Sequence, residues 1–425
     1  MSNNARVVPG GEIGVAQYLQ ALAAGVEPDV RMNPVLVKPE GDNKSQVVVL
    51  GSADLELSRQ PWLARSAGLW QPISESLSAL LAEHELVLIE GAGSPAEINL
   101  RETDLANMRT AVAAGAKVVL VADIDRGGAF AHLYGTWALL PPAERALLCG
   151  FVLNKFRGDA ALLPPAPERL AELTGVETLG VIPWLDHGLP DEDGAADPSG
   201  GKGRRVAVIR YPTASNLDEF KPLEQVTELR WAGRPEDLEA DLVVLPGSKH
   251  VAADLKWLRE RRLDHGVLAR VSAGLPLLGI CGGMQMLGER IVDAGDVDGD
   301  AAGLGILPLE TTFTTTKIVS RIDTRFDVLP APWASLTRRS VSGYEIRHGE
   351  SVAVGPVLSA LPDGRGFVAG SVLGVSVHGL FENPDIVAAL VGRAPDADLD
   401  DVFEKLAGAV EAALDVSLLL RKAGV

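Results

Sequence analysis

The sequence of 425 residues has no long hydrophobic run. Its longest apolar stretches, such as residues 86–89 and 118–122, have the length of a β-strand and fall far short of the ~20 residues that a membrane-spanning helix needs. The N-terminus also lacks the basic start and apolar centre of a secretory signal. These absences argue against a membrane span and predict a cytoplasmic protein.

Cysteine is scarce as well, and basic residues are outnumbered by acidic ones. The two cysteines, Cys149 and Cys281, lie in unlike contexts, and a reducing compartment favours two free thiols over a disulfide. The formal net charge is -18, whereas binding to nucleic-acid phosphates requires a basic surface. The composition therefore argues against nucleic acid as a partner.

The sequence does contain a regular alternation of short apolar runs and segments with helical periodicity, which is typical of parallel α/β sheets. A first group of strands is predicted over 46–50, 86–90, 117–122, 150–154 and 179–183. A second group is predicted over 205–210, 241–247, 275–281 and 374–379, with a helix over 399–422 packed on the second sheet.

The two groups of strands are separated by residues 186–204, which are rich in Gly, Pro and Asp and have no apolar periodicity. Such a composition is typical of a linker. The sequence therefore predicts an α/β protein with two parallel-sheet domains, over residues 1–185 and 205–425, joined by this linker.

The second domain contains a candidate nucleophile, Cys281, in the stretch "GICGG" (279–283). The spacing G-x-C-x-G is that of a nucleophile elbow, where a sharp strand-to-helix turn exposes the nucleophile and only glycines tolerate the crowding. The N-terminus of the following helix stabilises a thiolate and an oxyanion. The alternative is a small buried thiol in a Gly-rich turn, and position alone leaves both open.

A thiol nucleophile needs a base, and His378 is the best candidate among the seven histidines. It lies at the end of a predicted parallel strand, where parallel sheets place their sites. His250, at the end of another strand, is the rival. The turn before His250 offers the backbone N–H of Gly247 as an oxyanion donor, with the N–H of Gly282 as the second.

Polar residues follow the strands of the first domain. Glu90 ends one strand before a Gly-rich turn, as expected for a residue that holds Mg²⁺ against nucleotide phosphates, and Asn154 ends another, placed to contact a purine. Asp123, Asp125 and Arg126 precede a Gly pair and suggest a polar site. On spacing alone, helix capping or solvation is the favoured alternative for Glu90, and solvated turn charges are the more common explanation for Asp123, Asp125 and Arg126.

Three motifs of the second domain, "LPGSK", "GICGGMQMLG" and "VHGLFEN", resemble class I glutamine amidotransferases of the cobyric acid synthase branch, with a flavodoxin-like fold. The resemblance implies that Cys281 attacks the carboxamide of glutamine to form a glutamyl thioester and that His378 is the base. It also implies an oxyanion hole at Gly247 and Gly282, and a role for Gln285 in holding glutamine.

One position departs from the wider class. Many class I members carry a Glu two residues after the catalytic His, whereas this sequence has Leu380 there. We therefore expect a Cys–His dyad and do not assign Glu382 as a third member. An orienting partner for the histidine would still fix its tautomer.

The first domain contains "GGEIGVAQ", "MNPVLVKP", "EGAGSPAEINL", "ADIDRGG" and "FRGD", which resemble the synthetase half of the cobyric acid synthase family; the linker's "HGLP" and the second domain's "SNLDEF" do so too. The synthetase fold is related to dethiobiotin synthetase and other P-loop ATPases. The resemblance implies ATP-dependent amidation of carboxylates on adenosylcobyrinic acid a,c-diamide, with each carboxylate activated as an acyl phosphate.

The implied substrates are glutamine, a corrinoid, ATP and Mg²⁺, without a tightly bound prosthetic group. Glu90 would hold the metal, Asn154 the nucleotide, and Asp123, Asp125 and Arg126 are candidates for the acceptor site. The oligomeric state, including a homo-oligomer, stays open.

The phosphate-binding loop of that fold, G-x-x-x-x-G-K-[ST], is missing from the sequence. In the family it precedes the point that matches Met1, so the P-loop domain is expected to be incomplete. We favour Met1 as an internal methionine of a longer protein over a shortened form with glutaminase activity only. The motifs also leave room for a cobyrinate a,c-diamide synthase, a glutaminase subunit of a cell-wall precursor ligase or a non-catalytic binding protein.

Overall fold

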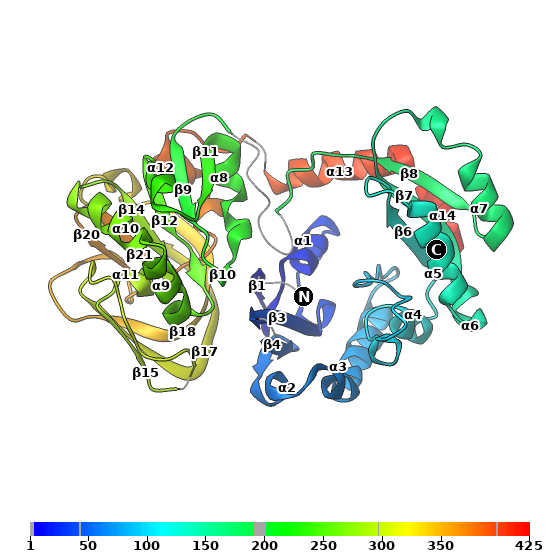
Figure 1. The fold of residues 1–425 in the computed structure, drawn as a ribbon, viewed down its shortest axis with the longest axis horizontal. Helices are drawn as coiled ribbons and strands as arrows, with labels where there is room; N and C mark the ends of the chain where they lie inside the picture. Colours follow the sequence, from blue (N-terminus) through cyan, green and yellow to red (C-terminus); the bar gives the residue numbers. More distant parts are fainter. Residues whose placement is uncertain (1–3, 42–43, 191–200, 296, 397) are drawn as a thin grey trace. The chain divides into compact units, whose positions relative to one another are not determined.

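The computed structural model describes residues 4–41, 44–190, 201–295, 297–396 and 398–425. They form two compact units (Figure 1). The first unit comprises Met1–Ser58 and Leu189–Asp398, and the second comprises Arg59–Gly188 and Leu399–Val425. Each unit thus contains one end of the chain, which differs from the contiguous ranges 1–185 and 205–425 of the sequence analysis.

A seven-stranded sheet forms the centre of the first unit, with the strand order β11-β9-β12-β14-β21-β20-β19. The strands are β9 (Arg205–Ile209), β11 (Glu228–Ala232), β12 (Leu242–Leu245), β14 (Leu277–Ile280), β19 (Leu358–Leu361), β20 (Gly366–Ala369) and β21 (Val372–Val375). The first five in spatial order pair in parallel, and the last two are antiparallel. The strands predicted over 205–210, 241–247 and 275–281 are confirmed, whereas the strand predicted over 374–379 is β21, which ends at Val375.

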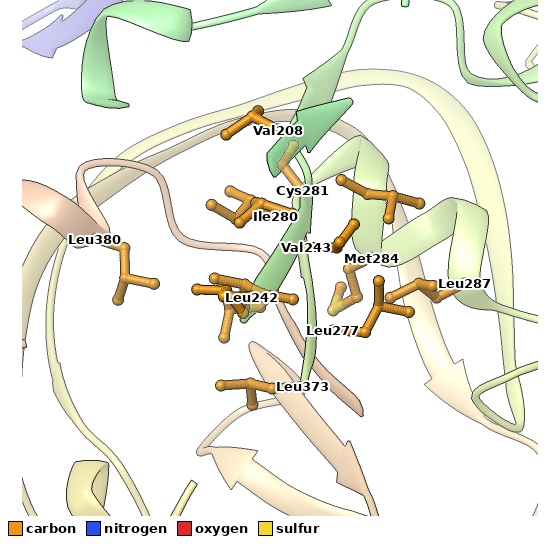
Figure 2. Close-up of a cluster of buried hydrophobic side chains, with 14 of the residues drawn as sticks. Val208, Leu242, Val243, Leu277, Ile280, Cys281, Met284, Leu287, Leu373 and Leu380 are labelled. Atoms are coloured by element: carbon orange, nitrogen blue, oxygen red, sulfur yellow. The ribbon is translucent and has the colours of Figure 1, made fainter. Parts of the chain in front are cut away.

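Short helices follow strands of this sheet in the chain. They are α8 (Lys221–Val226), α9 (Val251–Glu260), α10 (Leu263–Ser272), α11 (Gly282–Leu287) and α12 (Pro384–Val391). Every residue of β12, β14 and β21 is buried, as in parallel strands that are covered on both faces. Figure 2 shows part of the resulting aliphatic core, with Cys281 at its edge beside Ile280.

A second, mostly antiparallel sheet of this unit has the order β16-β15-β17-β18. Its strands are β15 (Arg290–Asp293), β16 (Ala301–Ala302), β17 (Leu309–Arg325) and β18 (Ser340–Ala353). The long hairpin of β17 and β18 reaches the main sheet where Tyr344 forms a β-bridge with His378. The two-residue strands β10 (Ala214–Ser215) and β13 (Gly247–Ser248) form a further small antiparallel pair.

The N-terminal segment belongs to the first unit. It contains β1 (Ala5–Val8), β2 (Gly11–Gly14), α1 (Val15–Ala23), β3 (Val35–Gly41), β4 (Lys44–Val49), β5 (Ser52–Asp54) and α2 (Leu55–Arg59). The strand expected over 46–50 is therefore present as β4, but its place in the first parallel sheet was predicted wrongly. It pairs antiparallel with β3 and β5, because the chain on both sides of it folds back locally.

The second unit is built on a three-stranded parallel sheet, β6-β7-β8, formed by Val118–Asp123, Leu148–Phe156 and Thr178–Pro183. Its helices are α3 (Trp62–Glu83), α4 (Met108–Ala114), α5 (Ala129–Leu139), α6 (Pro142–Arg145), α7 (Ala166–Thr174), α13 (Leu399–Ala413) and α14 (Val416–Ala423). Phe151 and Leu153 are fully buried at its centre. The three strands predicted over 117–122, 150–154 and 179–183 are confirmed.

The C-terminal helix differs from its prediction. It forms two helices, α13 and α14, and α13 packs on β8 of the second unit rather than on the sheet of the first. Gly180 makes this approach possible, since a Cβ there would lie 2.2 Å from the carbonyl oxygen of Ala413. Lys405 Nζ also donates to the carbonyl of Asp186 at 2.7 Å.

The strand predicted over 86–90 is not formed. Leu86, Leu88 and Ile89 expose 41%, 88% and 38% of their surface. An apolar run becomes a strand only when a neighbouring strand satisfies its backbone, and among the described residues none pairs with this segment.

Within the predicted linker, residues 191–200 lie outside the described residues. Of the helices in the described part of the chain, none combines the length and hydrophobicity that crossing a bilayer requires.

Candidate active site

Cys281 lies at a sharp turn between β14 and α11. Its backbone has φ 50° and ψ −108°, a region that residues other than glycine rarely adopt. A Cβ on Gly279 would lie 2.9 Å from the backbone of Gly283, and one on Gly283 would lie 2.0 Å from the carbonyl oxygen of Leu245. The G-x-C-x-G spacing therefore follows from the packing of the turn, and the backbone N–H of Cys281 donates to Val375 at 2.7 Å.

His378 follows the neighbouring strand β21 and is oriented by Glu219. Its Nδ1 lies 3.0 Å from Oε1 of Glu219, whose Oε2 accepts from the backbone N–H of Gly379 at 2.8 Å. Both side chains are almost fully buried. Since a carboxylate only accepts, Nδ1 carries the proton of this hydrogen bond and Nε2 is left for the thiol.

Sequence reasoning missed Glu219, which is 159 residues from His378 in the chain. It lies in the 3-10 turn η4 (Leu217–Phe220), within the family-like motif "SNLDEF". That motif was the one available signal, because nothing in its spacing links it to the histidine. The position two residues after His378 is Leu380, fully buried and apolar.

The charges around His378 favour its protonated form. Burial lowers the pKa of the imidazole, but Glu219 and Cys281 oppose this effect and together raise the pKa to about 10. At neutral pH the ring therefore carries a proton on both nitrogens. This imidazolium stabilises a neighbouring thiolate.

The two predicted oxyanion donors lie beside this pair. A Cβ on Gly247 would lie 2.7 Å from Cε1 of His378, and a Cβ on Gly282 would lie 2.6 Å from the backbone N of Ser248. The turn at Gly247 and the start of α11 are thus packed together. Asp254 supports this turn by accepting from Oγ of Ser248 at 2.7 Å.

Gln285 lies one turn after Cys281 on α11, and its Nε2 donates to the carbonyl of His348 at 3.2 Å. His250, the rival base, has a different partner, since its Nδ1 lies 3.1 Å from Oδ1 of Asp298. The structure therefore brings Cys281, His378 and the two glycines together, and it adds Glu219.

In the second unit, most of the predicted polar residues gather at the carboxyl edge of β6 and β7. Asp123 Oδ2 lies 3.3 Å from Lys155 Nζ and 3.4 Å from Arg126 Nε. Asp123 on β6 is also the register partner of Asn154 on β7. Asp125 pairs with Arg157 at 3.2 Å.

Glu90 lies in the exposed segment that forms no strand. Over the described ranges, no three His, Cys, Asp or Glu side chains are grouped as metal ligands. The Mg²⁺ site at Glu90 stays a prediction.

The turn at Cys281 and the buried His378 follow neighbouring parallel strands, as expected for a glutamine amidotransferase unit. In agreement, residues 205–386 match the CobB/CobQ-like glutamine amidotransferase domain, and residues 59–189 match an AAA domain. Both matches confirm the predicted α/β fold with a synthetase domain of the P-loop type and an amidotransferase domain.

Full-length relatives narrow this class to one family. Cobyric acid synthase of a Polaromonas species is 50% identical, over 97% of this chain and 88% of the relative. Those of Variovorax paradoxus and Paracidovorax citrulli are 52% and 54% identical, over 99% and 97% of this chain and 90% and 88% of the relatives. The chain belongs to the cobyric acid synthase family. It is thus an enzyme, a ligase for glutamine-dependent amidation in cobalamin synthesis, as the motifs predicted.

Proposed function

We propose that the chain amidates peripheral carboxylates of adenosylcobyrinic acid a,c-diamide to give adenosylcobyric acid, with ATP as the energy source and glutamine as the source of ammonia. The observation that carries the glutaminase part is the buried Glu219–His378 pair beside Cys281. The names of the relatives and the matched ATPase-type domain support the synthetase part.

In the glutaminase reaction, the Cys281 thiolate attacks the carboxamide carbon of glutamine. The oxygen of the tetrahedral intermediate faces the backbone N–H groups of Gly247 and Gly282. The His378 imidazolium then donates its proton to the leaving nitrogen, which departs as ammonia, and a glutamyl thioester remains.

Hydrolysis of the thioester completes the cycle. His378 accepts a proton from water as the water oxygen attacks the thioester carbon, and the C–S bond breaks to return the thiolate and release glutamate. Glu219 keeps the ring oriented in both steps and stabilises its charged form. Gln285, held by His348, would contact the substrate glutamine.

In the synthetase half, a corrinoid carboxylate would be activated as an acyl phosphate by ATP and captured by ammonia. Asn154 is the candidate for nucleotide contact, and Asp123, Asp125 and Arg126 are candidates for the acceptor site. When bound, Mg²⁺ would offset the charge of the phosphates. We assign no protein ligand to it beyond the sequence-based candidate Glu90.

We propose a functional division in chain order: a synthetase half over 1–185, a linker over 186–204 and an amidotransferase half over 205–425. The matched ranges 59–189 and 205–386 support it. The compact units cross these boundaries at both ends of the chain, so the functional and packing divisions differ. The cytoplasmic location stays a prediction.

The test follows two products of the same chain: glutamate released from glutamine, and phosphate released from ATP in the presence of the a,c-diamide corrinoid. We expect both, with amidated corrinoid. Phosphate formation with cobyrinate itself as the preferred acceptor would favour a cobyrinate a,c-diamide synthase. Glutamate without phosphate would favour a chain with glutaminase activity only.

A further inference from the structure

The turn η4 contacts two different parts of the first unit. On one side, Glu219 binds His378 as described above. On the other side, the neighbouring residues bind strand β1: Asn216 Oδ1 accepts from the backbone N–H of Ala5 at 3.2 Å, and Asp218 forms an ion pair with Arg6. The same short turn therefore orients the histidine and holds the N-terminal segment.

Arg6 is the centre of this second set of contacts, and its side chain is only 6% exposed. Its Nη1 donates to the hydroxyl of Tyr344 at 2.6 Å, and its guanidinium carbon lies 5.0 Å from the centre of that ring. Its Nη2 also pairs with Glu382 at 2.6 Å. A buried arginine with this many partners holds each of them in one geometry.

Tyr344, in turn, is in direct contact with His378. The two rings stack at 5.5 Å between their centres, with an angle of 21°. Their backbones exchange two hydrogen bonds, since Tyr344 N–H donates to His378 at 3.1 Å and His378 N–H donates to Tyr344 at 2.8 Å. Arg6 thus contacts a residue that flanks the imidazole and another, Asp218, that adjoins its carboxylate partner.

We propose that Arg6 is a positioning residue for glutamine hydrolysis, which it supports by fixing Tyr344 and Asp218 on either side of the Glu219–His378 pair. The inference rests on the proposed glutaminase function. Arg6 lies outside residues 205–386, the range that matches the amidotransferase domain. The glutaminase centre is therefore completed by the N-terminal segment.

Charge balance gives a second reason. Asp218 is fully buried, and it lies near the carboxylates of Glu219 and Glu382. Burial raises the pKa of Asp218 to about 6, although the positive charge of Arg6 lowers it. Without Arg6, a buried carboxyl group beside Glu219 would lose its counter-charge, and η4 would have to shift or Asp218 would have to take up a proton.

The test measures the rate of glutamate release against glutamine concentration in the full chain. We expect Arg6→Met to lower kcat by about tenfold, which is typical when a residue that orients a catalytic group is lost. KM for glutamine should change by less than about twofold, because Arg6 does not contact the substrate. Arg6→Lys keeps the charge without the planar fork and should fall between Arg6→Met and the unchanged chain. Adding Asp218→Asn to Arg6→Met should recover part of kcat.

Glu27→Gln is the matched control. Glu27 joins the same segment to β17 through an exposed ion pair with Arg321 at 2.9 Å. A wild-type kcat for both Arg6 variants, or an equal loss in Glu27→Gln, would overturn the proposal. If Arg6→Met does not fold, as judged by its thermal transition, Arg6→Lys decides. Absence of glutamate release from the unchanged chain would instead refute the glutaminase function itself, and release that persists in Cys281→Ser would refute Cys281 as its nucleophile.

Discussion

At the scale of single residues, the central feature of the site is a carboxylate, Glu219, that orients His378 and stabilises its positive charge. His378 pairs with Glu219, and the rival base His250 pairs with Asp298. The two pairs offer a direct comparison, because each consists of an imidazole and a carboxylate at about the same separation, but only one lies beside Cys281.

Replacing Glu219 by Gln should lower kcat/KM for glutamine by about 100-fold, since the neutral amide orients His378 less well and does not stabilise its charge. Burial lowers the pKa of His378, and Glu219 is the first of the groups that raise it to about 10. Without the carboxylate this pKa falls, so the alkaline limb of the pH profile should move to lower pH.

The measurement is the initial rate of glutamate release as a function of pH, with Asp298→Asn as the control. Asp298→Asn should retain the activity and pH profile of the unchanged chain. If Asp298→Asn lost activity while Glu219→Gln did not, His250 would be the base.

Much of this site could be predicted from the sequence, because the elbow at Cys281 is a local pattern. The glycines follow from contacts within one turn, and His378 and Gly247 follow from the rule that parallel strands end at a common edge. Glu219 and Arg6 could not be predicted in this way. They are brought near the histidine by tertiary packing, and their spacing from His378 in the sequence does not indicate this proximity.

At the scale of elements, the N-terminal segment is held to the long hairpin by a buried ion cluster. Oε2 of Glu12 on β2 lies 2.5 Å from Nζ of Lys38 on β3, and its Oε1 lies 2.5 Å from Nζ of Lys317 on β17. Burial raises the pKa of Glu12, but the two lysines outweigh it and lower the pKa to about 2. Burial lowers the pKa of Lys38 to about 8, so the lysine remains charged at neutral pH.

This cluster should make the stability of the first unit dependent on acid. Because the pKa of Glu12 is lower in the folded state than its usual 4.5, its contribution is present above pH 4.5 and lost as the pH falls toward 2. The contribution is on the order of 3 kcal/mol. Glu12→Gln should unfold at lower temperature near neutral pH and lose stability less steeply on acidification.

Thermal unfolding followed between about pH 7 and about pH 3 measures this slope. Glu27→Gln, which removes only an exposed ion pair of the same segment, should keep the slope of the unchanged chain. An unchanged slope in Glu12→Gln would show that the cluster does not couple stability to acid.

The elements that were predicted wrongly share a physical cause. Periodicity identifies an apolar run, but it does not identify the partner of that run. The run at 86–89 lacks a neighbouring strand among the described residues, β4 pairs with its chain neighbours, and α13 packs on Gly180 of the second unit. In each case the sequence pattern did not indicate which strand or sheet the segment packs against.

At the scale of the whole molecule, two reactions are assigned to two sets of residues. The residues proposed for glutamine hydrolysis all lie in the first unit, whereas Asp123, Asp125, Arg126 and Asn154 lie in the second. If ammonia is the only product that passes from one reaction to the other, free ammonia should replace the first reaction entirely.

Cys281→Ser tests this separation. The serine hydroxyl is a far weaker nucleophile than a thiolate, so glutamine-dependent amidation of the corrinoid should fall below detection. Amidation with an ammonium salt should keep the rate of the unchanged chain, because the thiol takes no part in acyl phosphate formation.

Cys149→Ser is the matched control. Cys149 is half-buried in the second unit, on β7, and this variant should retain both activities. The measurement is amidated corrinoid formed from each nitrogen source. Equal loss of both activities in Cys281→Ser would contradict the two-site mechanism, since a thiol needed only to release ammonia is dispensable when ammonia is supplied.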